Sequence, residues 1–233
     1  MIGGAACDLI FDVENGTAFR ATKDLDLVLI VEALNPEFGR VFWSFIREGG
    51  YEHTVKSTGL PQFYRFSHPT QHGFPFMLEL FSRSGFELDD QDSTLTPLPI
   101  GEEVSSLSAI LIDEDYYRML LEGRESIEGI RVLSELYLIP FKAKAWLDLT
   151  LKKLEGSHVD SKDIKKHKND IARLAMLLSG EEHCALPETV MQDMKQFMEA
   201  YRQEPSDPKS WGMNISAITI VDVLDRVYGT GTS

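Results

Sequence analysis

The sequence predicts an α+β protein whose first half mixes strands with helices and whose second half is helical. Residues 25–31 form an almost continuous apolar and β-branched stretch, which is typical of a buried strand. Residues 62–68 and 75–82 are rich in aromatic and apolar side chains around a turn, which predicts a hairpin of two further strands. In the second half, apolar residues recur at helical spacing instead. We therefore expect an α+β domain over residues 1–130 and a helical domain over 131–233.

The other elements of the first half follow from local signals. A helix is expected from Gly3-Gly4 to a turn at Asn15-Gly16. Asn35-Pro36 is an N-cap followed by proline at the first helical position, and Gly49-Gly50 ends that helix. The remaining expectations are a surface loop over 87–96, a strand over 104–112 and a short helix from Asp113 to Gly123.

Four helices are expected in the second half. The first covers 134–154, with Pro140 as its kink or its true start. The second covers 161–179 and ends at Gly180. The third, over 187–202, has one apolar face, and residues 215–227 favour a helix over a strand.

Composition excludes several classes of protein. The 233 residues carry 37 acids against 23 bases, a net charge of −14, so the surface as a whole cannot attract phosphate as a polybasic protein does. Two cysteines and no CxxC pair argue against a disulfide framework and a zinc site. No apolar run reaches the ~18–20 residues of a membrane span, and the first residues lack the pattern of a signal peptide. We expect a cytoplasmic protein without a membrane partner.

Two aspartates on the first strand are the strongest chemical signal. Side chains alternate between faces, so Asp24 and Asp26 lie on one face, about 7 Å apart. Carboxylates on an apolar strand repel one another and need a cation, and rigid oxygen ligands suit Mg²⁺. A purely structural interpretation is also open. In it, Asp24 is simply solvated at the end of the strand, and Asp26 is the only carboxylate whose position needs an explanation.

Two further features strengthen the case for chemistry. Glu79 is the only charge in the apolar run 74–81, and beside the first strand it would supply a third carboxylate for two-metal phosphoryl transfer. It could equally be a solvent-facing residue of an edge strand. Gly3-Gly4 at a helix N-terminus would let phosphate approach backbone N–H groups, although the pair could also be an ordinary turn.

The order of these motifs along the chain resembles that of the polymerase-β-like nucleotidyltransferase superfamily. Within that superfamily, it is most similar to the AbiEii/AbiGii-type toxin nucleotidyltransferases. The resemblance covers residues 1–180. In the first half it rests on Gly3-Gly4, Arg20-x-Thr22-x-Asp24-Leu25-Asp26 and Leu78-Glu79-Leu80. In the helical half it rests on Lys142-x-x-Ala145-x-x-Asp148 and Lys166-His167-x-x-Asp170-Ile171.

The resemblance implies a mixed sheet with flanking helices, followed by a helical domain. It also implies roles for individual residues. Asp24, Asp26 and Glu79 would bind two Mg²⁺ ions, and Lys142 would reach the nucleotide phosphates. The other nucleotide-binding residues it implies are Gly3, Gly4, Arg20, Thr22, Lys166 and Asp170.

The function expected is transfer of a nucleoside monophosphate from an NTP to a hydroxyl acceptor. The acceptor stays open between tRNA, a protein and a small molecule, and the resemblance implies a toxin with a cognate antitoxin. The alternative is a nucleotide- or partner-binding domain of the same fold without efficient chemistry. Glu79, where the superfamily usually has aspartate, favours this alternative. A lysine cluster over 152–168 is either a solvated helix face or a surface that attracts phosphate.

Overall fold

The computed structural model confirms the α+β class, with a mixed sheet and, among the described residues, seven α-helices. The described residues are 1–15, 23–54, 62–83, 95–98, 108–211 and 215–230. They form two compact units. Unit 1 comprises 1–117 and 126–132, and unit 2 comprises 118–125 and 133–233. No helix in the described part of the chain combines the length and hydropathy that a bilayer-spanning segment requires.

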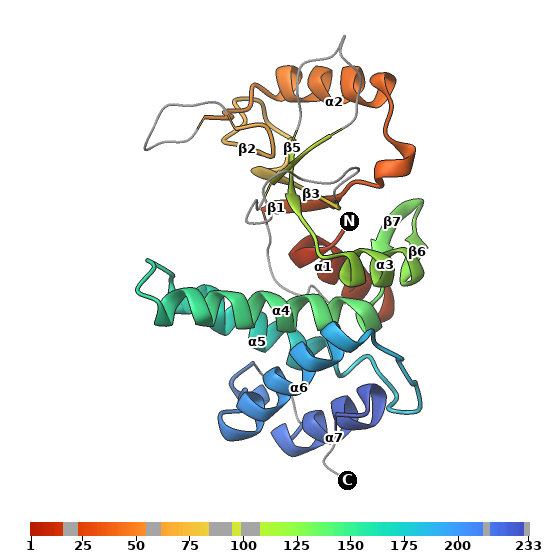
Figure 1. Cartoon of the computed structure of the whole chain (residues 1–233), viewed down its shortest axis with the longest axis vertical. Helices are drawn as coiled ribbons and strands as arrows, with labels where there is room; N and C mark the ends of the chain where they lie inside the picture. The colour runs from red at the N-terminus through yellow and green to blue at the C-terminus, as the bar shows by residue number, and fades with distance from the viewer. Residues whose placement is uncertain (16–22, 55–61, 84–94, 99–107, 212–214, 231–233) are drawn as a thin grey trace. The chain divides into compact units, whose positions relative to one another are not determined.

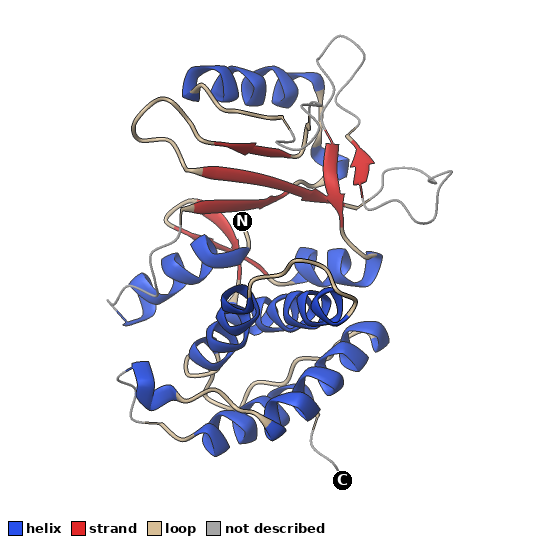
Figure 2. Cartoon of the chain, turned by 90° about the vertical axis from the view of Figure 1, so that its left-hand side faces the viewer, coloured by secondary structure: helices blue, strands red, loops and turns tan. Residues whose placement is uncertain are grey.

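The five-stranded sheet belongs to unit 1 (Figures 1 and 2). Its three parallel strands are β1 (Asp24–Val28), β3 (Met77–Ser82) and β5 (Ser108–Leu111), in the order β1-β3-β5. Two short strands pair antiparallel, β2 (Arg65–Ser67) with β3 and β4 (Leu95–Pro97) with β5. The predicted hairpin is therefore confirmed as β2–β3. β1 ends at residue 28, earlier than predicted, because the chain then turns into the 3-10 helix η1 (Val31–Ala33).

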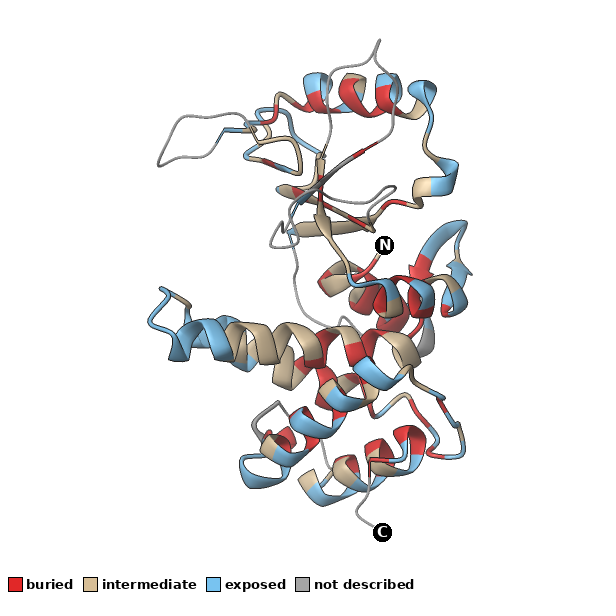
Figure 3. Ribbon diagram, in the orientation of Figure 1, coloured by how far each residue is buried: buried red, intermediate tan, exposed pale blue. Residues whose placement is uncertain are grey.

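Helix α2 (Pro36–Gly49) supplies the main core of unit 1. Its N-cap Asn35 accepts a hydrogen bond from the Phe38 amide at 2.8 Å, and Gly50 ends it with φ of 62°. Buried residues recur along one side of the helix (Figure 3). They pack with the apolar face of the sheet in a cluster that includes Phe42, Trp43, Ile46, Phe66, Leu78 and Leu80.

Other elements of the first half also match the expectations. Helix α1 (Gly3–Asn15) packs against β1, and α3 (Glu114–Glu122) begins after Asp113, whose carboxylate accepts from the Asp115 amide. The expected loop over 87–96 lies outside the described residues up to 94, and 95–97 form β4. The hairpin β6 (Arg124–Ile127) and β7 (Ile130–Leu133) was not predicted.

Unit 2 is a helical bundle. Helix α4 (Glu135–Leu154) lies beside α5 (Ser161–Leu174), with α6 (Glu188–Gln203) packed on α4 and α7 (Ala217–Tyr228) on α6 (Figure 1). The short helix η2 (Pro208–Trp211) joins the last two. The apolar face predicted for the third helix is buried, as Val190, Met194, Phe197, Met198 and Tyr201.

The second helix of this half ends at residue 174 rather than at the expected 179. Tighter turns replace its last residues, with the Met176 amide donating to the Arg173 carbonyl at 3.1 Å and the Leu177 amide to the Leu174 carbonyl at 3.0 Å. The Glu182 carboxylate then accepts hydrogen bonds from the Ser179 and Gly180 amides at 3.0 and 2.9 Å. These backbone donors hold the pKa of Glu182 down to about 2.

Pro140 lies inside α4, and a hydrogen bond from elsewhere in unit 2 compensates for its missing N–H. In a regular helix, the amide of residue 140 would donate to the carbonyl of Leu136. Here the Tyr228 hydroxyl donates to that carbonyl at 2.6 Å. Tyr228 is buried, and burial raises the pKa of its hydroxyl well above the usual value. The hydroxyl therefore stays protonated and available as a donor.

We expect Tyr228→Phe to lower the free energy of unfolding by about 1–3 kcal/mol, because the part-buried carbonyl of Leu136 loses its donor. The loss should be smaller in a Pro140→Ala background, where the amide of residue 140 can donate instead. Urea titration of the two single variants and the double variant measures this difference. Equal losses in both backgrounds would show that Tyr228 does not compensate for the proline.

Candidate functional site

The predicted carboxylates share one face of the sheet. On β1, Leu25 and Leu27 pack against the core cluster, so the alternating Asp24 and Asp26 face away from it. On β3, Glu79 lies between the buried Leu78 and Leu80, and it too faces away from the core.

The register of the parallel pair brings two of these acids side by side. The Cα partner of Asp26 on β1 is Glu79 on β3, across a strand spacing of about 4.8 Å. Asp24 lies two residues before Asp26 on β1, opposite Met77. The sheet therefore places Asp24, Asp26 and Glu79 on one face, and we refer to these three residues as the carboxylate row.

A residue that the sequence did not single out completes this row. Arg65 on β2 is the antiparallel partner of Glu79, and its guanidinium Nε lies 2.5 Å from Glu79 Oε1. The Glu79 side chain is 14% exposed and that of Arg65 is 45% exposed. Asp26, Glu79 and Arg65 thus lie side by side across β1, β3 and β2. The Arg65 guanidinium offsets the repulsion between Asp26 and Glu79.

Helix α1 begins against Asp26. The Ile2 amide donates to the Asp26 carbonyl at 3.0 Å, so the chain before the helix runs along the outer edge of β1. Gly3 has φ of +75°, and a Cβ there would lie 1.8 Å from Asp26 Oδ2. Only glycine allows this approach, which sets the positive end of the helix beside a carboxylate. Gly4 is the next residue of α1 and is buried.

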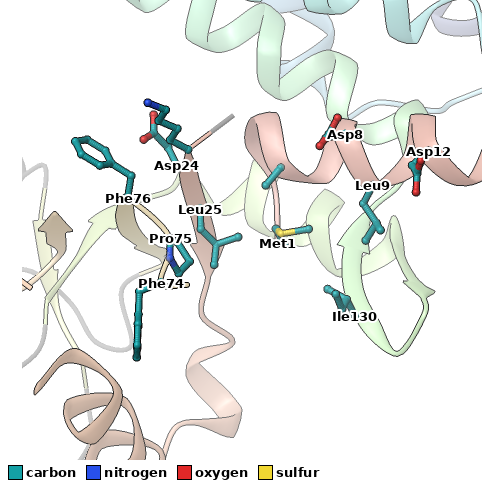
Figure 4. Close-up of a pocket in the computed structure, with 12 residues that line it drawn as sticks. Met1, Asp8, Leu9, Asp12, Asp24, Leu25, Phe74, Pro75, Phe76 and Ile130 are labelled. Atoms are coloured by element: carbon teal, nitrogen blue, oxygen red, sulfur yellow. The ribbon is translucent and has the colours of Figure 1, made fainter. Parts of the chain in front are cut away.

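A cavity of about 750 Å³ opens between α1 and β1, within unit 1 (Figure 4). Asp24 and Lys23 line it from the strand, and Asp8 and Asp12 line it from the helix. Leu9 and Phe76 are among its apolar lining residues. Three aspartates against one lysine repel a free phosphate group, so an anionic ligand would have to enter together with a cation.

The donors on this face fit a hard divalent ion by their chemistry, since all are carboxylate oxygens. Their present rotamers do not gather around one point. Within the part of the chain that the structure describes, no three His, Cys, Asp or Glu side chains are grouped closely enough to hold an ion. Glu79 is bonded to Arg65 instead.

In unit 2, Lys142 and Asp170 form a buried ion pair. Lys142 Nζ on α4 donates to Asp170 Oδ2 on α5 at 2.8 Å, and the two side chains are 4% and 2% exposed. The pair ties the two helices together in a medium where an isolated charge is costly. Lys166 lies half-buried on α5. The nucleotide-binding roles of these residues stay predictions, and Arg20 and Thr22 lie outside the described residues.

The sequence-based prediction also missed Asp8 and Asp12. Their spacing of four residues on a helix was the available signal, because such residues share one face. Comparisons with protein-family models, with curated proteins and with solved structures found no match for this chain.

Gly3→Ala should destabilise unit 1 more than Gly73→Ala does. Both residues have positive φ, which costs an alanine about 1–2 kcal/mol, but a Cβ at residue 73 meets nothing within 4 Å. The alanine at residue 3 must also displace the Asp26 carboxylate. Urea titration of both variants measures the difference, and equal losses would contradict the close approach of α1 to Asp26.

Removal of one partner of the buried ion pair should be strongly destabilising. Lys142→Met or Asp170→Leu alone should cost about 3–5 kcal/mol, because each leaves the other charge buried without its ion-pair partner. The double variant should lose much less than the sum of the two. Chemical denaturation of all three variants tests this, and additive losses would show that the pair is not coupled.

Proposed function

We propose that the chain is a Mg²⁺-dependent nucleotidyltransferase of the polymerase-β-like type. The observation that carries the proposal is the pairing of Asp26 with Glu79 on adjacent parallel strands, with Asp24 on the same face. The start of α1 against Asp26 gives further support, because a glycine-led helix N-terminus beside paired carboxylates is the arrangement that the resemblance implies. The acceptor class and a role as a toxin with a cognate antitoxin rest on the resemblance alone.

In the proposed reaction, the acceptor hydroxyl oxygen bonds to the α-phosphorus of an NTP while the bond to the β-phosphate oxygen breaks. Pyrophosphate leaves, and the hydroxyl proton passes to a carboxylate or to water. Asp24, Asp26 and Glu79 would hold Mg²⁺, which neutralises charge on the phosphate oxygens when bound. Asp8 and Asp12 would disfavour nucleotide that arrives without its metal, since they add negative charge to the cavity.

Gly3 would act as a positioning residue. Its lack of a side chain allows the α1 backbone to approach the Asp26 carboxylate, which fixes where that carboxylate lies. Lys142 would add the phosphate contact that the resemblance implies. In the structure Lys142 is the ion-pair partner of Asp170, so Lys142 would have to share its ammonium group between Asp170 and a phosphate.

One observation favours a second candidate, a nucleotide- or partner-binding domain without efficient chemistry. Arg65 already supplies a positive charge to Glu79, through a hydrogen bond of 2.5 Å. A guanidinium in this place compensates the acid permanently and competes with a metal ion for it. Such a domain would bind a nucleotide but not transfer it.

Label transfer from α-³²P-labelled NTPs, with Mg²⁺ and with tRNA, lysate protein or no acceptor, tests the proposal. Asp26→Asn should abolish transfer, a loss of at least 100-fold, because it removes a charge from the centre of the carboxylate row. The control is Asp222→Asn, an exposed residue of α7, which should leave transfer unchanged. Circular dichroism checks that both variants are folded.

The outcomes separate the two candidates. Label in one fraction that disappears in Asp26→Asn supports the enzyme and identifies its acceptor class. NTP binding by calorimetry without any transfer supports the binding domain. Absence of both binding and transfer contradicts each candidate and leaves the carboxylates with a structural role.

A further inference from the structure

A second cavity, of about 560 Å³, lies wholly within unit 2 and apart from the carboxylate row. It is lined by residues of α4, of α5 and of the segment 204–207 that follows α6. Its volume is in the range of pockets that hold small organic molecules. Three lysines line it, namely Lys153, Lys165 and Lys168, and we refer to it as the lysine pocket.

The lysine pocket is basic in an acidic protein. Residues 150–169 contain six lysines and three acids, whereas the whole chain has 37 acids against 23 bases. Glu204 and Asp207 are the two acids among the lining residues, against the three lysines. A local excess of ammonium groups at a concave surface attracts anions, because the concave shape concentrates the positive electrostatic potential of those groups.

The three ammonium groups are held in place by different partners. Lys153 Nζ donates to the Ser161 hydroxyl, which is neutral. Lys168 Nζ donates to the Glu204 carbonyl at 2.9 Å and lies 3.5 Å from its carboxylate, which is 89% exposed. Lys165 has no hydrogen-bond or ion-pair partner among the described residues. The positive charge of the pocket is therefore only partly compensated.

An aromatic donor adds a second, independent signal. Trp146 lines the pocket, and its ring packs edge-on against Phe197, with centroids 5.5 Å apart. Its indole Nε1 is buried and has no hydrogen-bond partner among the described residues. A buried N–H without an acceptor is costly, and a ligand oxygen would satisfy it only after a small shift of the indole, since the atom is closed to solvent. Ile164 and Pro205 extend the apolar part of the wall.

We propose that the lysine pocket binds a small phosphomonoester with an apolar or planar body, of about the size of a mononucleotide. The phosphate would lie among Lys153, Lys165 and Lys168, and the body would lie along Trp146 and Ile164. Glu204 and Asp207 would accept hydrogen bonds from hydroxyl or amino groups of the ligand. An extended polyanion fits less well, because a concave pocket of about 560 Å³ holds a small molecule rather than a run of phosphates.

The test uses the full chain with AMP as the probe, in EDTA so that the carboxylate row of unit 1 holds no metal. Calorimetry should detect AMP binding, and tryptophan fluorescence should change on binding. Adenosine, which lacks the phosphate, should bind at least 10-fold more weakly. Ribose 5-phosphate and inorganic phosphate should bind more weakly than AMP, because they lack the planar body.

Matched lysine variants distinguish a pocket from a generally basic surface. Lys165→Gln/Lys168→Gln should weaken AMP binding at least 10-fold. Lys152→Gln/Lys162→Gln removes the same amount of charge from residues of α4 and α5 that do not line the pocket, and should change affinity less than 2-fold. Trp146→Phe should weaken binding several-fold and remove the fluorescence change.

Asp26→Asn should leave AMP binding intact, so failure of the nucleotidyltransferase proposal and failure of this one are distinguishable. Equal losses in the two lysine pairs, together with tighter binding of a single-stranded RNA oligomer, would overturn the pocket in favour of a diffuse nucleic-acid surface. No binding of AMP at millimolar concentration would also overturn it.

Discussion

Parallel pairing of β1 with β3 brings together Asp26 and Glu79, which are far apart in the sequence. The register is fixed from the other side of the sheet, where Leu78 and Leu80 are buried in the core with α2. A slip of one residue would turn those leucines to the carboxylate face and the acids into the core, at a prohibitive cost. The carboxylate row is thus a consequence of how the apolar side of the same strands packs.

The row needs positive charge to be stable, and two sources of it are built into the fold. Arg65 approaches Glu79 from β2, and the N-terminus of α1 approaches Asp26 where Gly3 permits it. Both sources are fixed by backbone pairing rather than by flexible side chains alone. Unit 1 therefore tolerates its acids without a bound ion, and a metal that enters would compete with these existing contacts.

Much of the fold could be predicted because its signals are local. Alternation on each strand located Asp24, Asp26 and Glu79 on one face, and caps located α2 and α3. Arg65 could not be found this way, because its role depends on the antiparallel register of β2 against β3. The β6–β7 hairpin was missed although Glu128 and Gly129, both with positive φ, form a two-residue turn between Ile127 and Ile130.

The hydrogen bond from Tyr228 to the carbonyl of Leu136 has a consequence for synthesis of the chain. Pro140 removes the local donor, so the first turn of α4 depends on a residue near the C-terminus. Leu136 leaves the ribosome long before Tyr228 does. Until Tyr228 is available, water must donate the hydrogen bond to the Leu136 carbonyl. The helical unit can therefore complete its native hydrogen bonds only after α7 has been translated, even if its helices form earlier.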